Sequence, residues 1–263
     1  MNGVIYTPLI DSMKWSYSRI KSFDTCAYAW YLKYICGDEE EDNFYASYGS
    51  FVHKLIEKYY KGEIPQHNLA MNFLLGFPLE VRGRKPSSDL VDKYMLKGYQ
   101  YFQTFQPFCY NLISVEEKIS FKVDGREFVG YVDFIGEDDS GICIVDHKSR
   151  DLKKRSGRSK PTKKDEELDE FLKQLYLYSI GVKERYGEYP SKLCFNCFKS
   201  GEFIEEPFDI NALHEARQWA TQEIERIRRT DEFRPSIDWF YCSNLCGFKK
   251  ECCYFNDFGK PIA

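Results

Sequence analysis

The chain has 263 residues, of which 43% are hydrophobic and 17% aromatic, so it can build a substantial core. No stretch approaches the roughly 18 apolar residues of a membrane span, and the N-terminus lacks the basic and apolar regions of an export signal. These features predict a cytoplasmic, intracellular protein with no membrane partner. Ten cysteines without an export signal favour metal binding over a disulfide scaffold.

The first third of the chain is predicted to be helical. Helical spacing of apolar residues predicts helices over residues 16–35, 49–60, 66–76 and 87–105. Ser16 or Ser18 is suited to cap the first of them, and Pro107 follows the last. The sequence therefore indicates an N-terminal helical region over residues 1–110.

The pattern then changes to β. Runs rich in β-branched and aromatic residues predict strands over residues 113–123, 127–135, 141–147, 192–199 and 202–208. Asp124-Gly125 is a strong hairpin turn between the first two strands. Helices are predicted over residues 165–186 and 211–229. This order predicts an α/β (α+β) fold with a central mixed sheet over residues 111–230, followed by a cysteine-rich segment over residues 231–263 that packs on the N-terminal helix.

Positive charge is concentrated in one segment. Residues 147–164 carry nine Lys and Arg against the single acid Asp151, which is +8, so the rest of the chain carries −12 of the overall −4. A local cationic loop suits phosphate binding because solvent and salt screen charges farther than about 10 Å away. A solvated loop explains the same composition.

The segment from Gly130 to Arg150 carries the most informative pattern. Asp133 is predicted to end a strand, and the next strand leads into Asp146-His147-Lys148. Residues two apart in a strand share a face, so Asp146 and Lys148 point together while His147 points away. Carboxylates from adjacent strands suit Mg²⁺ or Mn²⁺, and the lysine could orient an attacking water. Two surface aspartates and a solvated lysine would give the same residues.

This ordering resembles the RecB-like branch of the PD-(D/E)XK nuclease superfamily, in which G-x-x-D precedes an apolar strand that ends in D-x-K. The resemblance implies a restriction-endonuclease-like core and catalytic roles for Asp133, Asp146 and Lys148. It also implies that Asp133 and Asp146 hold the metal, with His147 of the same motif as a further candidate ligand. Histidine stands at position 147 where the family more often has an aromatic residue.

Further motifs extend the resemblance from Ser16 to Cys252, apart from an unmatched interval from about Lys61 to Asn111. The segment GSFVHKLIE looks like the family's G-x-x-x-H motif, which implies that His53 is another metal ligand. Gln174 and Tyr178 are similar to the Q-x-x-x-Y motif, and their spacing of four places them on one helix face near the site. Of Glu116 and Glu117, strand alternation lets only one face inward, and Glu116 is preferred.

Thiols form a second group of candidate ligands. Cys242, Cys246, Cys252 and Cys253 lie close together near the C-terminus, and Cys26 lies on the first predicted helix. Four thiolates complete either a 4Fe-4S cluster or a zinc site, and spacing alone does not decide between them.

Resemblance to the iron–sulfur members of the family implies a 4Fe-4S cluster bound by an early cysteine and a late trio. The implied ligands are Cys26, Cys242, Cys246 and Cys252, with Cys253 as the spare or the alternative. The other five cysteines are predicted to pack in the core; they are Cys36, Cys109, Cys143, Cys194 and Cys197.

The sequence therefore predicts a metal-dependent DNase. The resemblance implies an exonuclease on single-stranded DNA ends, with 5′-to-3′ polarity favoured, that works with a protein partner in recombination, replication or CRISPR adaptation. The alternative is a catalytically silent module of the same fold that binds DNA ends or assembles with a partner. A zinc-bearing adaptor is a third possibility.

Overall fold

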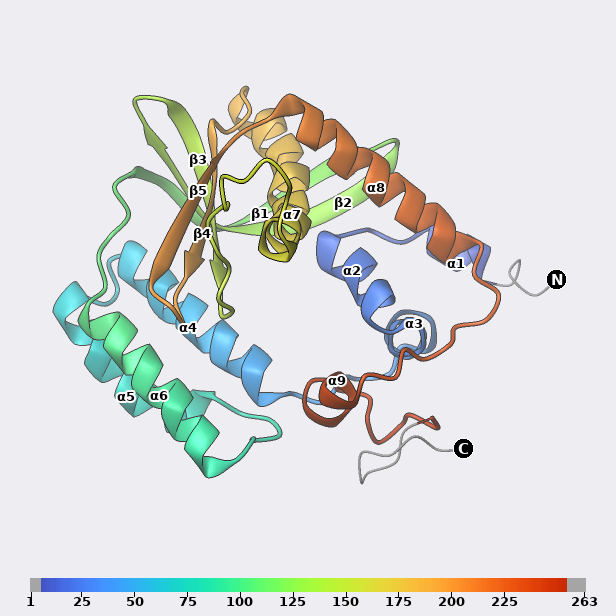
Figure 1. Cartoon of the computed structure of the whole chain (residues 1–263), viewed down its shortest axis with the longest axis horizontal. Helices are drawn as coiled ribbons and strands as arrows, with labels where there is room; N and C mark the ends of the chain where they lie inside the picture. The colour runs from blue at the N-terminus through green and yellow to red at the C-terminus, as the bar shows by residue number, and fades with distance from the viewer. Residues whose placement is uncertain (1–5, 255–263) are drawn as a thin grey trace.

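The computed structural model describes residues 6–254 and centres on a five-stranded mixed sheet (Figure 1). The strands are β1 (Asn111–Val123), β2 (Arg126–Asp138), β3 (Gly141–Lys148), β4 (Lys192–Cys197) and β5 (Glu202–Pro207). The α-helices are α1 (Thr7–Asp11), α2 (Tyr17–Thr25), α3 (Ala27–Tyr31), α4 (Phe44–Tyr60), α5 (Leu69–Glu80), α6 (Ser88–Gln103), α7 (Lys163–Tyr186), α8 (Ile210–Arg228) and α9 (Trp239–Asn244). The predicted α/β fold with a mixed sheet is confirmed.

The strands lie in the order β1-β2-β3-β4-β5, and every neighbouring pair is antiparallel except β3 and β4, which are parallel. A parallel pair needs a long crossover connection, and α7 provides it. The β1–β2 hairpin turns at Asp124 and Gly125, whose φ angles of 48° and 83° are both positive as a type I′ turn requires. The predicted hairpin is confirmed.

Two helix predictions need correction. The expected single helix over residues 16–35 is interrupted at Cys26, which is extended and both ends α2 and caps α3. The chain continues from α3 as a π-helix, Leu32–Cys36, and stops at Gly37 in the left-handed conformation. Helix α4 begins at Phe44, five residues earlier than predicted, because the Asn43 side chain accepts a hydrogen bond from the backbone N–H of Ala46.

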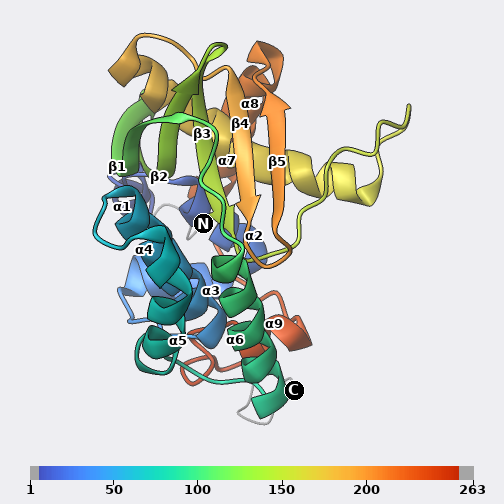
Figure 2. The same ribbon diagram turned by 90° about the vertical axis from the view of Figure 1, so that its left-hand side faces the viewer.

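Several hydrophobic clusters hold these elements together. The largest joins α1–α3, α7 and α8 to one face of the sheet, around residues such as Trp15, Trp30 and Leu175. Helices α4–α6 form a second cluster around Phe44, Phe73 and other aromatic side chains, and they make a separate helical lobe (Figures 1 and 2). Of these helices, α4 also contacts β1. A short 3₁₀ helix, Gln66–Asn68, leads into α5.

The C-terminal segment packs against the N-terminal helices. Cys246 and Phe248 are buried against Cys26, Ala29 and Leu32. Residues 255–263 of the predicted cysteine-rich segment lie outside the described residues. Nowhere in residues 6–254 does a helix combine the length and the apolar character needed to cross a bilayer.

The cysteines that were predicted to pack in the core divide into two sets. Cys143, Cys194 and Cys197 are buried, whereas Cys36 and Cys109 are exposed, so the prediction is wrong for those two. Cys36 ends the π-helix and Cys109 lies in the loop before β1, where neither is covered by a further layer. Cys194 and Cys197 join different hydrophobic clusters, as their odd spacing in β4 requires.

Gly130 in β2 lets α7 approach the sheet. A Cβ atom at this position would lie 2.3 Å from Cε1 of Tyr178. Such a contact is far inside van der Waals distance and the Tyr178 ring is buried, so the side chain cannot move away cheaply. The glycine of the G-x-x-D motif is therefore required for packing of α7 over the site.

We expect Gly130→Ala to lower the free energy of unfolding by about 1–3 kcal/mol, because it overpacks the α7 interface. Urea denaturation followed by circular dichroism measures this change. The matched control is Gly49→Ala in α4, where a new Cβ meets nothing closer than 4.0 Å and the helix gains up to about 1 kcal/mol. Equal stability of the two variants would contradict the assigned role of Gly130.

Candidate active site

The candidate site lies where β2 and β3 separate. The two strands pair from Asp138 and Gly141 as far as Phe134 and Val145, and no further. Beyond this point the backbone N–H of His147 donates to Oδ2 of Asp133 at 2.6 Å instead of to a β2 carbonyl. Asp133 was predicted to lie at the end of a strand over residues 127–135, but β2 in fact extends on to Asp138. The carboxylate therefore occupies the fork between two strands, where a side chain replaces a ladder hydrogen bond.

Helix α4 brings His53 to this fork. Its Nε2 lies 3.0 Å from the carbonyl oxygen of His147. Because a carbonyl only accepts, Nε2 carries a proton there and Nδ1 faces the carboxylates. Nδ1 is 3.5 Å from Oδ2 of Asp133 and 4.0 Å from Oε1 of Glu116. One donor atom from each of His53, Glu116 and Asp133 lies within 4.8 Å of the others.

Glu116 reaches the site through an unusual backbone. Its φ angle is 49°, in the left-handed region that non-glycine residues avoid at a cost of about 1–2 kcal/mol. The adjacent Glu117 turns away to accept a hydrogen bond from the Tyr186 hydroxyl at 2.6 Å and to pair with Arg185. The structure thus directs Glu116 to the site and Glu117 to the C-terminal end of α7. Strain of this kind persists where surrounding contacts fix the conformation.

The charges at the fork are strongly coupled. Burial would raise the pKa of Asp133, but the positive His53 ring and the hydrogen bond from His147 hold it near 2. Burial would lower the pKa of His53, yet Asp133, Asp146 and Glu116 raise it to about 9. Burial and the Asp133 charge raise the pKa of Glu116 to about 7. The carboxylates therefore leave excess negative charge at the fork, and a proton on His53 neutralises only part of it.

Lys148 is fixed beside the fork by three partners. Its Nζ lies 2.7 Å from Oδ2 of Asp146 and donates to Oε1 of Gln174 at 2.9 Å. Gln174 in turn donates to Oδ1 of Asp146 at 2.8 Å and lies 3.2 Å from the Tyr178 hydroxyl. The ammonium also lies over the ring of Phe171, 5.1 Å from its centroid. Gln174 therefore bridges the acid and the base of the D-x-K motif.

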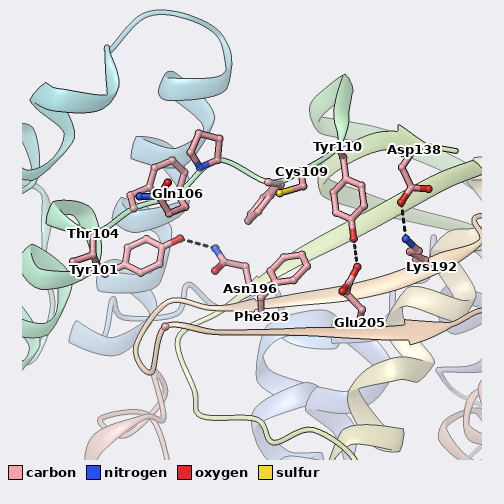
Figure 3. A pocket seen from close by; sticks show the side chains of 14 residues that line it. Tyr101, Thr104, Gln106, Cys109, Tyr110, Asp138, Lys192, Asn196, Phe203 and Glu205 are labelled. Atoms are coloured by element: carbon pink, nitrogen blue, oxygen red, sulfur yellow. Dashed lines mark hydrogen bonds and ion pairs between the residues drawn. The ribbon is translucent and has the colours of Figure 1, made fainter. Parts of the chain in front are cut away.

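The His147 side chain lies on the opposite face of the strand from Lys148. Its Nδ1 is 3.2 Å from Nδ2 of Asn196, which also donates to the Tyr101 hydroxyl at 2.8 Å. Asn196 and Tyr101 line a cavity of about 530 Å³ between β4, β5 and the segment that leads into β1 (Figure 3). Burial lowers the pKa of His147 to about 3, so its ring is neutral. The backbone of His147 bonds to Asp133 and His53, and its ring also meets the His53 ring edge to face, with 5.1 Å between the ring centroids.

The predicted site residues thus fall into two groups. His53 and Asp133 converge at the fork, and Asp146, Lys148, Gln174 and Tyr178 form the adjoining network. Asn196 and Tyr101, which support His147, carry no sequence signal because an isolated asparagine in a strand is common. Glu116 was only a preference from alternation, and its contact with His53 depends on the irregular backbone.

A comparison with protein families decides the identity of this fold. The model of the PD-(D/E)XK nuclease superfamily matches residues 14–253. The chain belongs to the PD-(D/E)XK nuclease superfamily. Asp133, Asp146 and Lys148 lie within the matched range, as do Gly130, His53 and the motif on α7.

Solved structures resemble this superfamily member as well. A "Putative exonuclease" from Eubacterium rectale is 15% identical, with a TM-score of 0.54 and coverage of 100% of this chain and 94% of that chain. The protein SSO0001 is 14% identical, with a TM-score of 0.31 and coverage of 90% and 94%. The first of these likenesses supports the shared fold. Curated proteins give no match.

The residues at the fork fit a divalent cation. Two carboxylates and an imidazole nitrogen are the donor set, and their donor atoms are close enough to share one ion. Hard oxygen donors with few protein ligands suit Mg²⁺ or Mn²⁺, which keep several of their waters. Burial first and then the Asp133 charge raise the pKa of Glu116, while the surrounding carboxylates raise the pKa of His53 against burial, so negative charge at the fork favours a cation in both cases.

We expect Glu116→Gly to keep or raise the stability of this nuclease fold while it weakens Mn²⁺ binding. Glycine relieves the left-handed strain and removes a carboxylate that repels Asp133, which offsets the greater entropy of the unfolded chain. The free energy of unfolding should stay within about 1 kcal/mol of the parent or exceed it. Thermal denaturation and titration calorimetry with Mn²⁺ measure the two effects.

The control Glu117→Ala should give the opposite pair of results. It removes the carboxylate that pairs with Tyr186 and Arg185, and it should lower the free energy of unfolding by about 1–2 kcal/mol. Mn²⁺ binding should be retained. A Glu116→Gly variant that is destabilised and binds Mn²⁺ normally would show that Glu116 does not serve the site.

Proposed function

We propose that this protein is a Mg²⁺- or Mn²⁺-dependent DNase that hydrolyses phosphodiester bonds. Membership in the nuclease superfamily supports the reaction, and the convergence of His53, Glu116 and Asp133 next to Lys148 carries the proposal. When bound, the metal supplies Lewis-acid activation of water and of the scissile phosphate. His53, Glu116 and Asp133 would hold it, with Asp146 as a further acid at the site.

Each remaining side chain has a role that follows from its contacts. The Lys148 ammonium orients the attacking water and neutralises charge that builds on the phosphate, because Asp146, Gln174 and the Phe171 ring fix its position. Gln174 holds Lys148 and Asp146 in one arrangement, and Tyr178 supports Gln174 from the next turn of α7. Burial raises the pKa of Asp146, and the nearby ammonium opposes this and favours the ionised carboxylate.

We propose further that the substrate is a single-stranded DNA end, degraded with 5′-to-3′ polarity. The polarity and the exonuclease mode come from the resemblance to the RecB-like branch. The anchored helical lobe supports the preference for unpaired strands, because α4 carries His53 and its N-terminal side is tied to the C-terminal segment. Asn43 donates to the carbonyl of Leu245, and the N–H of Glu41 donates to the carbonyl of Gly247. We propose that this tether restricts access to His53 and so favours one strand over a duplex.

Degradation of DNA labelled at the 5′ or the 3′ end tests the activity, the strand preference and the polarity together. We expect Mg²⁺ or Mn²⁺ to be required, and Lys148→Ala or Asp133→Ala to lower turnover by about 10²–10⁴-fold. Lys173→Ala is the matched control, because Lys173 neighbours Gln174 but pairs with Glu170 outside the site.

Full activity in the Lys148→Ala variant would refute the catalytic assignment. Tight single-strand binding without any hydrolysis by the parent would favour a DNA-end-binding module of the same fold.

We also propose that a 4Fe-4S cluster binds to Cys26, Cys242, Cys246 and Cys252. These four residues line one small cavity between α3 and α9. Burial and the neighbouring thiols raise the pKa of Cys246 to about 11, so metal must replace protons for the thiolates to form. Cys253 is not among the residues that line this cavity, and its Sγ lies 3.6 Å from the hydroxyl of Tyr28, which does line it.

Sulfur spacing supports a cluster over zinc. Tetrahedral zinc with bonds of about 2.3 Å needs thiolate sulfurs about 3.8 Å apart. Within the described part of the chain, no three thiol sulfurs lie within 4.8 Å of one another. A cluster is larger than a single ion and bridges thiolates that are set farther apart. Its structural effect would be to join the break between α2 and α3 to the C-terminal segment.

Anaerobically purified protein should show the broad absorption at about 400 nm that iron–sulfur clusters give. Cys246→Ser should remove this band and expose the C-terminal segment to protease, whereas Cys253→Ser should leave both unchanged. Metal analysis that finds zinc and no iron in the anaerobically purified protein would contradict the assignment of a 4Fe-4S cluster.

A further inference from the structure

The segment between β3 and α7 forms a basic arm, which we define as residues 150–164. It leaves the end of β3 just after Lys148, runs beside β5, and returns at the first turn of α7. Figure 2 shows the arm and the start of α7 extending beyond the β5 edge of the sheet. The arm therefore begins at the proposed active site and ends well outside it.

One set of basic side chains in the arm is engaged in structure. Lys153 pairs with Glu202 of β5 at 2.8 Å. Arg155 pairs with Glu206 and with Asp169, each at 2.5 Å. Leu152 is buried, and the Asp165 carboxylate accepts hydrogen bonds from Ser156 and Thr162. These contacts fix the arm against β5 and α7, so it has a defined position in the fold.

A second set has no acidic partner. Among residues 6–254, no ion pair involves the exposed side chains of Lys154, Arg158, Lys160, Lys163 and Lys164. Lys163 and Lys164 stand in the first turn of α7, where the helix dipole disfavours positive charge. Five like charges on one short segment repel one another in the free protein. Such an arrangement is relieved when an anion binds.

We propose that this second set binds the sugar-phosphate backbone of a DNA strand several nucleotides from the bond that is cut. The inference rests on the proposed function, which places the reacting phosphate beside Lys148. Gln174, which contacts Lys148, follows Lys163 by eleven residues of α7, or about 16 Å along the helix axis. At about 3.4 Å per stacked nucleotide, the unpaired cations meet phosphates roughly five nucleotides from the site.

The proposal separates two effects. Phosphate contacts release counterions, so each lost contact should reduce the slope of log affinity against log salt by about 0.7 on a single strand. The contacts should also depend on substrate length, because a strand too short to reach the arm cannot use it. Neither effect should depend on base sequence.

The test uses a variant of the whole chain in which Lys154, Arg158, Lys160 and Lys163 are replaced by glutamine. The matched control carries the same charge change at four exposed lysines elsewhere, which are Lys85, Lys93, Lys118 and Lys122. Binding to fluorescent single-stranded oligonucleotides of about four and about thirty nucleotides is measured in metal-free buffer at several salt concentrations.

We expect the arm variant to bind the long strand at least about ten-fold more weakly near 0.1 M salt, with its salt slope reduced by about 2–3. Its affinity for the short strand and its thermal stability should match the parent. The control variant should bind both strands nearly as the parent does.

Equal loss in the arm and control variants would show a general charge effect and would overturn the proposal, as would an unchanged affinity for the long strand. Binding in metal-free buffer does not require hydrolysis, so the experiment tests the DNA contact of the arm and the proposed nuclease function independently. Hydrolysis by the parent with no effect of the arm variant would refute the arm alone. Loss of long-strand binding in the arm variant, together with a parent that cuts no DNA, would refute the nuclease function alone.

Discussion

The separation of β2 from β3 is the constraint on which the site depends. At this fork the Asp133 carboxylate takes the hydrogen bond from the His147 N–H that another strand residue would otherwise accept. The same residue presents its carbonyl to His53 on α4, so one residue of β3 positions two candidate ligands from other elements. Burying these charges is costly, and only dense hydrogen bonding and opposite charge make it tolerable.

Rigid packing holds the fork open. Gly130 lets the Tyr178 ring lie directly on β2, which brings Gln174 over Asp146 and Lys148. On the other face, Asn196 contacts the His147 ring and is itself bonded to Tyr101, so the strand is supported from both sides. The positive φ of Glu116 shows that bringing a third acid to the site strains the backbone at that residue.

Elements distant in the sequence are joined around this centre. Helix α4 belongs to a lobe with its own aromatic core, yet its N-terminal end is bonded to the C-terminal segment. Cys26, at the break between two short helices, faces the cavity that three late cysteines also line. The proposed cluster would therefore control how firmly the lobe that carries His53 is held.

The sequence was enough to predict the mixed α/β fold, the Asp124-Gly125 hairpin and the motif residues, because these depend on local periodicity, turn chemistry and spacing within one element. It did not determine the break at Cys26, the start of α4, the exposure of Cys36 and Cys109, or the extension of β2 beyond Asp133. Tertiary contacts direct Glu116 to His53 and Glu117 to Arg185, and they place Asn196 beside His147. These outcomes depend on contacts between segments far apart in the chain, where packing and charge overrule local preference.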